Sequence, residues 1–231
     1  MTAPGPDGVS QAGSARAGSD RAGSGRAASV RTAFVPAARL VGWTERFGAA
    51  HGGFRIRDDD DGVRLLAADG TTALLQAPWP PDGRPGRGSG PLERLASMAG
   101  QPRTAGLVLV RRGGYAVAVA REGGVAASKT GSRYVQGRRA NQADELVEKV
   151  AVQAAAIFGG HAIGYLAPGG DRTLANLVLA HAAMKPYAAL PRLAFLDVAD
   201  PNGSVLRKAA ADICSVRIQV TDAAGQAVSR S

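Results

Sequence analysis

The periodicity of apolar and polar positions predicts a small module in the first half of the chain. Apolar residues recur at helical spacing between residues 38 and 51, and Gly52-Gly53 ends this predicted helix. Three strand-like stretches follow, with acidic or Asp-Gly turns between them: 54–57, 63–68 and 72–77. We therefore expect one helix followed by β-hairpins.

The second half of the chain alternates predicted strands and helices. Three stretches form a meander with Gly-containing turns: 107–111, 115–121 and 124–129. A long helix is predicted at 139–158, where Leu146, Val150, Ala154 and Ile157 line one face. Strand and helix then alternate at 162–166, 172–183, 194–197, 205–211 and 213–220. This is the order of a ribonuclease H-like mixed sheet, so the expected fold class is α/β (α+β), preceded by the small helix-plus-hairpin module.

Composition sets the expected boundaries between these parts. The N-terminal segment repeats a five-residue pattern of small residues with one Arg each, which predicts disorder. A stretch rich in Pro, Gly and Arg from Pro78 to Pro91 predicts a linker. The expected parts are a disordered tail (1–32), the small module with its linker (33–90), the α/β domain (91–221) and a C-terminal tail (222–231).

The charge and the cysteine count narrow the expected setting. A formal net charge of +9 favours polyanionic partners such as nucleic acid or an anionic membrane surface, although free use of Arg by a GC-rich genome is the alternative. Cys214 is the only cysteine, so no intramolecular disulfide or cysteine-based zinc cluster can form, and its apolar surroundings predict a core residue. No apolar run reaches the ~20 residues of a membrane span, and the N-terminus lacks the apolar core of a signal peptide. We therefore expect a cytoplasmic protein.

A basic segment between the meander and the long helix carries the clearest candidate chemistry. Residues 127–143 contain Lys129, Arg133, Arg138 and Arg139 and no acidic residue. Guanidinium groups bind phosphate bidentately, and glycine lets the backbone approach phosphate closely, so the segment suits RNA. A solvated basic connection without function is the alternative that these residues alone leave open.

Several motifs in and around this segment occur together. They are Arg111 to Val117 (RRGGYAV), Ala127 to Lys129, Gly131 to Arg138 (GSRYVQGR), Arg139 to Ala143, Gly169 to Arg172 and Phe195 to Val198, and nearer the start Pro36 to Leu40, Trp43 and His51 to Gly53. Together they resemble the actinobacterial branch of the Vms-like release factors, over about residues 33–220. The resemblance implies a domain similar to the middle domain of eukaryotic and archaeal release factors.

The resemblance also implies an activity and partners. Members of this family are peptidyl-tRNA hydrolases that rescue stalled nascent chains: a loop enters the peptidyl-transferase centre of the large ribosomal subunit, where water cleaves the ester between peptide and tRNA. Ester hydrolysis needs an oriented water and a stabilised oxyanion. We expect a monomer that needs no metal or organic cofactor. Candidate residues are Gln136 and Arg133 for catalysis, and Lys129, Arg133, Tyr134, Arg138 and Arg139 for RNA binding.

The chain departs from the family pattern at the tip of the loop. Family members usually carry an insert between the equivalents of Arg138 and Arg139, and the Gly-Gly and catalytic Gln lie within it. Here the two arginines are adjacent. Gln136 belongs to the ascending limb of the loop in the family. Three explanations stay open: the loop was removed or left out of this sequence, the protein is a non-catalytic RNA- or ribosome-binding module, or Gln136 has taken over catalysis.

Other sites are weaker candidates. Gly169-Gly170-Asp171 precedes a predicted helix and could bind an anion, but without a Walker lysine Asp171 is expected to cap the helix. Asp171, Asp197 and Asp200 could form a nuclease-like acidic cluster, which the strand placement does not favour. The three histidines are widely spaced and make no metal signature. A structural protein whose positive charge is incidental is a third hypothesis.

Overall fold

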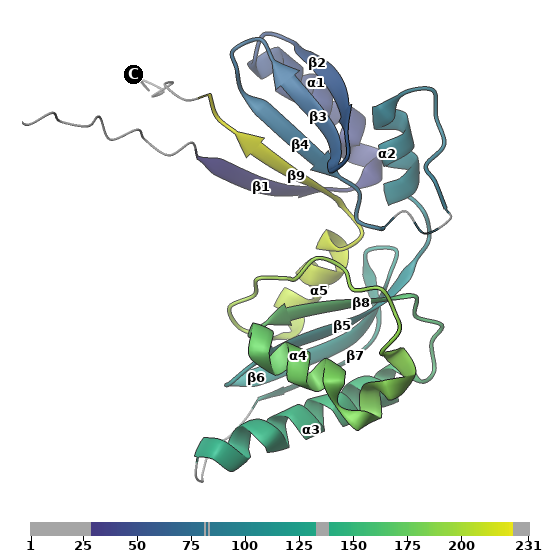
Figure 1. The fold of residues 1–231 in the computed structure, drawn as a ribbon, viewed down its shortest axis with the longest axis vertical. Coiled ribbons are helices and arrows are strands. Elements are labelled where there is room, and N and C mark those ends of the chain that lie inside the picture. Colours follow the sequence, from purple (N-terminus) through teal and green to yellow (C-terminus); the bar gives the residue numbers. More distant parts are fainter. Residues whose placement is uncertain (1–28, 81, 83, 133–138, 224–231) are drawn as a thin grey trace, which may run out of the picture.

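The computed structural model describes residues 29–80, 82, 84–132 and 139–223, with the backbone alone at 139–142. Two sheets, each with its own helices, are stacked along the long axis of the molecule (Figure 1). The mixture of helices with antiparallel and mixed sheets confirms the expected α+β class. The segments 1–28, 133–138 and 224–231, which include most of the expected tails, lie outside the described residues.

The first sheet is antiparallel throughout. Its strands in spatial order are β1 (Val30–Val35), β9 (Val216–Thr221), β4 (Thr72–Gln76), β3 (Gly62–Ala67) and β2 (Phe54–Asp59). A short 3-10 helix (Ala37–Arg39), α1 (Leu40–Ala50) and α2 (Pro91–Ala99) pack against one face only. The core between them contains Leu40, Phe47, Leu65, Leu75, Leu95 and Ile218. The predicted helix and the three predicted strands are all present.

The last strand joins a different sheet from the one expected. The sequence pattern placed 213–220 in the α/β domain, but β9 pairs with β1 on one side and β4 on the other. Its buried Val216 and Ile218 alternate with the half-exposed Arg217 and Gln219. That alternation fits a strand with one solvated face, as in this sheet, and it carries no information about which sheet the strand joins. Residues 30–32, expected in the tail, begin β1.

The second sheet contains the predicted meander. Its strands in spatial order are β7 (Gly124–Ser132), β6 (Gly114–Arg121), β5 (Thr104–Arg111) and β8 (Tyr165–Gly170). The meander pairs are antiparallel and β5–β8 is parallel, which confirms a mixed sheet. In place of the expected strand at 194–197, two isolated parallel bridges join Arg192 and Leu196 to β8.

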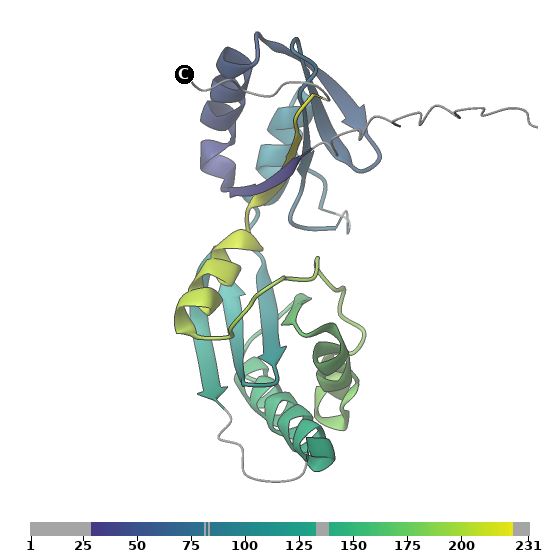
Figure 2. The same ribbon diagram turned by 90° about the vertical axis from the view of Figure 1, so that its left-hand side faces the viewer.

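Helices cover both faces of this sheet. Figure 2 shows α5 (Gly203–Asp212) on one face and α3 (Arg139–Phe158) with α4 (Arg172–Ala180) on the other; a 3-10 helix (Ala182–Tyr187) follows α4. Val108 and Val110 of β5 face α3 and α4, whereas Leu107 and Leu109 face α5. Burial on both faces explains why β5 is an unbroken apolar run rather than an alternating one.

Candidate functional site

The base of the predicted loop lies at the end of the second sheet that points away from the first sheet (Figure 2). β7 ends at Ser132 and α3 begins at Arg139. Lys129 lies on β7 and is exposed. Of the other candidates, Arg133, Tyr134, Gln136 and Arg138 lie outside the described residues, and the side chain of Arg139 does too. The structure therefore positions the base of the site and leaves the roles of these side chains as predictions.

The end of β7 is packed against the core by a tyrosine. Gly131 lies opposite Tyr115 of β6, whose side chain is only 2% exposed. A Cβ atom on Gly131 would lie 2.5 Å from Cε1 of the Tyr115 ring, so only glycine lets the ring cover the backbone here. The ammonium group of Lys149 on α3 lies 5.8 Å from the centroid of the same ring. The ring thus contacts both segments from which the loop starts and ends.

The same end of the sheet gathers arginines that the sequence interpretation did not single out. In the strand register, Arg111 lies opposite Gly114, Gly114 opposite Ser132, and Val110 beside Gly170. Arg112 therefore lies in the turn beside the loop base, and Arg172 opens α4 at the same edge; both are exposed. Both arginines belong to motifs that carry the resemblance. Had the strand after the long helix been paired parallel with the first meander strand, the sequence would have placed both arginines at this end of the sheet.

Two of these arginines also make local contacts. Arg111 Nε donates a hydrogen bond of 2.6 Å to the carbonyl oxygen of Val198, which ties the segment before α5 to the edge of the sheet. The Arg172 guanidinium lies 4.3 Å from the centroid of the Phe195 ring. Arg112 makes no ion pair with any residue that the structure describes. Lys129, Arg112 and Arg172 therefore form a basic group at the loop end of the second sheet, which we call the basic edge.

Asp171 is a helix cap, as expected. Its Oδ1 accepts hydrogen bonds from the backbone N–H groups of Thr173 (2.9 Å) and Leu174 (3.1 Å). A carboxylate already satisfies the first turn of α4, so the structure does not favour an external anion there. Asp197 is 97% exposed, and no group of three potential metal ligands occurs among the described residues, which leaves the nuclease-like cluster without support.

Cys214 is partly buried and packs against the core of the second sheet from the turn before β9, so the prediction of a core residue holds only in part. Burial raises the pKa of its thiol. A thiol held in its protonated form is a poor nucleophile. Nothing about this cysteine therefore indicates covalent catalysis.

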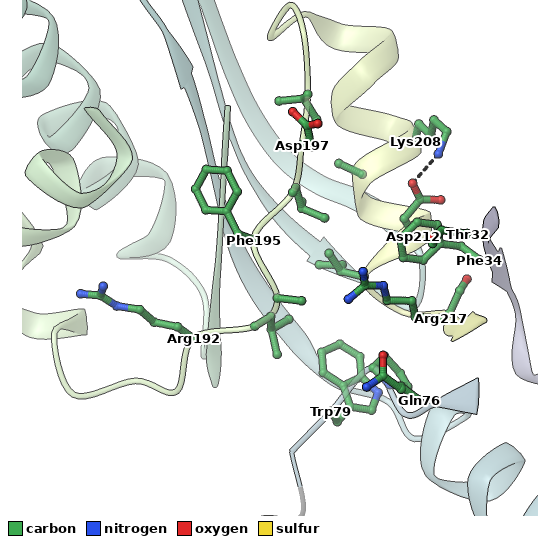
Figure 3. Close-up of a pocket in the computed structure, with 18 of the residues that line it drawn as sticks. Thr32, Phe34, Gln76, Trp79, Arg192, Phe195, Asp197, Lys208, Asp212 and Arg217 are labelled. Atoms are coloured by element: carbon green, nitrogen blue, oxygen red, sulfur yellow. Dashed lines mark hydrogen bonds and ion pairs between the residues drawn. The ribbon is translucent and has the colours of Figure 1, made fainter. Parts of the chain in front are cut away.

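A cavity of about 820 Å³ lies between the two sheets (Figure 3). β1, the end of β4, the segment 192–199 and α5 line it. Phe34 and Trp79 provide aromatic surface, and the nearby cations are Arg192, Lys208 and Arg217. Lys208 forms an ion pair with Asp212, and its ammonium group lies 5.6 Å from the centroid of the Phe34 ring. The cavity therefore combines aromatic and cationic groups from both halves of the molecule.

A polar cluster of Arg103, Asp82 and Tyr165 lies behind Trp79, which lines the cavity. The Arg103 side chain, 1% exposed, pairs with Asp82 at 2.7 Å, and the Tyr165 hydroxyl is hydrogen bonded to both. The Trp79 ring lies 5.2 Å from the Tyr165 ring. The hydrogen bond from Tyr165, with the nearby Arg103, lowers the pKa of Asp82, and burial raises the pKa of Tyr165. The cluster joins the linker to the starts of β5 and β8, which is a structural role.

No helix in the described part of the chain is long and apolar enough to cross a membrane.

Among curated proteins, no relative matches the sequence. Among solved structures, a crystal structure of Pelota from Archaeoglobus fulgidus is similar, with 14% identity and a TM-score of 0.32. That match covers 80% of this chain and 63% of the Pelota chain, so the protein spans less than two thirds of that relative.

The family comparison covers most of the second half of the molecule. Residues 103–219 match the family described as Actinobacteria/chloroflexi VLRF1 release factor. The matched segment runs from the start of β5 into β9 and includes the whole second sheet, the basic edge and the loop base. Because it spans more than half of the 231 residues, this chain belongs to the Actinobacteria/chloroflexi VLRF1 release-factor family.

Proposed function

We propose that this protein is a ribosome-associated peptidyl-tRNA hydrolase that releases nascent chains from stalled ribosomes. The observation that carries the proposal is the release-factor family match over residues 103–219. Its substrate would be the ester between peptide and tRNA, held by the large ribosomal subunit. The proposal includes action as a monomer, in the cytoplasm.

The geometry at the loop base supports this activity. A loop that must reach a reaction centre within RNA needs a fixed base and a cationic surround, because misplacement of about 1 Å can cost a hundredfold in rate. Tyr115 and Gly131 provide the packed base. Lys129, Arg112 and Arg172 add exposed cations at the same edge. These positions suit contacts with the phosphates of RNA, with Arg133, Arg138 and Arg139 as the proposed contacts of the loop itself.

In the proposed chemistry the loop orients water and RNA supplies much of the remaining environment. Gln136 is the proposed water-positioning residue of this chain, because its amide can both accept and donate hydrogen bonds. Arg133 would bind RNA backbone or hold the loop in place, and Tyr134 would stack beside it. The reaction adds water across the ester, freeing the peptide carboxylate and the tRNA hydroxyl.

The experiment measures peptide release from purified stalled ribosome–nascent chain complexes. Four proteins are compared: the natural sequence, Gln136→Ala, Arg133→Ala and a version carrying a relative's Gly-Gly-Gln-containing insert between Arg138 and Arg139. Arg39→Ala is the matched control, because Arg39 is exposed on the opposite half of the molecule. We expect the natural chain to release peptide. The rate of release should fall at least tenfold in Gln136→Ala and in Arg133→Ala, and it should be unchanged in the control. Absence of release, even from the version with the insert, would sink the proposal.

A second function is favoured by one specific observation. Arg138 and Arg139 are adjacent, and the insert that holds the family's Gly-Gly and Gln is missing between them. A non-catalytic RNA- or ribosome-binding module would keep the basic edge without that tip. It predicts salt-sensitive ribosome binding by the natural chain, with release only from the version with the insert. Failure to bind ribosomes or tRNA at low salt would exclude this alternative.

A further inference from the structure

The outer face of the first sheet is not covered by any described helix. α1 and α2 pack against the other face, where the buried Leu65, Leu75 and Ile218 lie (Figure 2). Side chains alternate between the two faces of a strand, so the residues next to these in each strand point outward. An uncovered sheet face in a protein of this charge is a candidate binding surface.

The strand register shows which side chains share this outer face. Directly paired residues of antiparallel strands lie on the same side. Arg57 pairs with Arg64 across β2 and β3, and Arg55 pairs with Leu66 beside them. Arg217 of β9 pairs with Phe34 on one side and Gln76 on the other. The face thus carries four arginines across its width: Arg55, Arg57, Arg64 and Arg217.

Negative charges lie at one end of this face only, in the turn between β2 and β3, where Asp58 to Asp61 follow one another. Asp59 lies on the face, and its Oδ2 binds Arg64 Nε at 2.9 Å, whereas Asp58 pairs with Arg94 of α2. Among the described residues Arg55, Arg57 and Arg217 form no ion pair within 4 Å, although Arg57 is near enough to Asp59 to help lower the pKa of that carboxyl. Like charges gathered on one surface repel one another and destabilise the folded state slightly, and a polyanion relieves that repulsion. The charge pattern therefore fits an anionic polymer.

The basic face continues into the cavity between the sheets. Phe34, Gln76 and Arg217 belong to both, because they lie on the outer face and also line the cavity (Figure 3). Lys208 and Arg192 line the cavity from the second half of the molecule, together with Asp197 and Asp212, and Lys208 is paired with Asp212. Phe34 is 37% exposed, and the Lys208 ammonium group lies 5.6 Å from the centroid of its ring, so part of the ring surface is open to a ligand. A partly exposed ring directly beside Arg217 suits stacking by a nucleobase whose phosphate contacts that arginine.

We propose that the outer face of the first sheet and the adjoining cavity form a second RNA-binding surface, which holds a single-stranded RNA segment. Arg55, Arg57 and Arg217 contact its phosphates, and the Phe34 ring stacks with one base. A single strand fits because its bases are free to stack, whereas the bases of a duplex are paired. The surface lies on the far side of the molecule from the loop base and does not depend on the proposed hydrolysis (Figure 1).

The test measures fluorescence anisotropy with a labelled single-stranded RNA of about 12 nucleotides, within the usual site sizes for such surfaces. All proteins carry Gln in place of Arg133, Arg138 and Arg139, which removes binding by the loop. One variant adds Arg55→Gln, Arg57→Gln and Arg217→Gln. Its matched control adds the same substitutions at three arginines away from the face: Arg39, Arg46 and Arg121. Both lose three positive charges, so a general charge effect would be equal in the two.

We expect the face variant to bind RNA at least tenfold more weakly than the control. Each lost phosphate contact on a single strand lowers the slope of log affinity against log salt by about 0.7, so the slope should fall by about 2 in the face variant only. Phe34→Ala should weaken binding about tenfold with the slope unchanged, because stacking is not ionic. This assay measures RNA binding and not peptide release, so its result tests the second RNA-binding surface independently of the proposed hydrolysis.

Three results would overturn the proposal. Equal losses in the two triple variants would mean that binding follows net charge and has no site on the face. Equal affinity for polyglutamate at the same ionic strength would point to an acidic protein as the partner. An affinity that is unaffected by all four substitutions on the face would remove the site altogether. Thermal unfolding of each variant confirms that the comparisons use folded protein.

Discussion

Replacing Gly131 with alanine tests whether the Tyr115 ring fixes the base of the loop. The new methyl group would lie 2.5–2.8 Å from three atoms of the ring, Cε1, Cζ and the hydroxyl oxygen. Non-bonded carbon atoms prefer about 3.5–4.0 Å, so the ring or the strand must move by nearly 1 Å. Tyr115 is 2% exposed and packs within the core under α3, which leaves the ring little space to move. Overpacking of this kind costs about 1–3 kcal/mol.

The free energy of unfolding is measured by urea denaturation, and the thermal midpoint gives a second readout. For a chain of this length each kcal/mol lowers Tm by about 2–4 °C, so Gly131→Ala should lower it by about 2–12 °C. Gly113→Ala is the matched control, because a Cβ atom there would meet nothing within 4 Å. Its free energy should change by less than about 0.5 kcal/mol.

A double-mutant cycle isolates the cause. In a Tyr115→Val background the ring is gone, so adding Gly131→Ala should cost little more than the control substitution. If Gly131→Ala costs the same with and without the ring, the steric explanation is wrong. Peptide release by Gly131→Ala should also fall under conditions where the protein is fully folded, since the loop base has shifted.

Three other residues yield predictions of different kinds. Asp171→Ala removes two hydrogen bonds at the start of α4 and should lower the free energy of unfolding in urea by about 1 kcal/mol, whereas Asp171→Asn should retain most of it; equal losses would argue against capping. Cys214 should react with Ellman's reagent at pH 8 far more slowly in the native protein than in denaturant, because burial raises its pKa; similar rates would contradict that burial. Hydrogen bonds from His51 and from the Thr71 backbone lower the pKa of Asp69, so its contribution to stability is present above its unfolded-state pKa, about 4, and is lost as the pH falls through the lower folded-state pKa. Asp69→Asn should therefore flatten the dependence of Tm on pH below about 4, and an unchanged slope would count against this linkage.

The sequence predicted the elements whose signals are local. The long helix has the predicted bounds, Arg139–Phe158, because apolar residues recur along it at helical spacing over many turns. The Gly-containing turn predicted between the strands 115–121 and 124–129 is also present, as Glu122-Gly123 between β6 and β7. Both residues have positive φ, 53° and 78°, as a two-residue hairpin turn with the twist of the strands requires. A glycine at the second turn position is the sequence signal that predicts such a turn.

Elements that depend on distant partners were missed or misplaced. β1 and β9 pair across almost the entire chain, Val30 with Thr221, and no local pattern encodes such pairing. α2 went unpredicted because it is nine residues long and follows the Pro- and Gly-rich linker, although Pro91 sits at its first turn, where proline is favoured.

The candidate site shows the same division between local and distant information. Motif residues at the loop could be named from the sequence, and Lys129 is exposed on β7 beside the loop base. Arg112 and Arg172 join that edge only because β5 and β8 run parallel, which brings the ends of two separate segments together. The sequence did not reveal the basic face of the first sheet. Arg217 shares a face with Arg55 of β2 only because β9 pairs with β4 in that sheet.

The return of β9 to the first sheet gives the molecule two covalent connections between its halves, one leading from β4 to β5 and one from α5 to β9. Two domains joined by one linker can rotate in any direction, whereas two domains joined by two linkers rotate mainly about the axis through both linkers. Any relative movement of the halves should therefore open or narrow the cavity between them rather than rotate one half past the other. The family-matched segment, cut out at residues 103–219, would carry β9 without either of its neighbours and would leave the first sheet split in two.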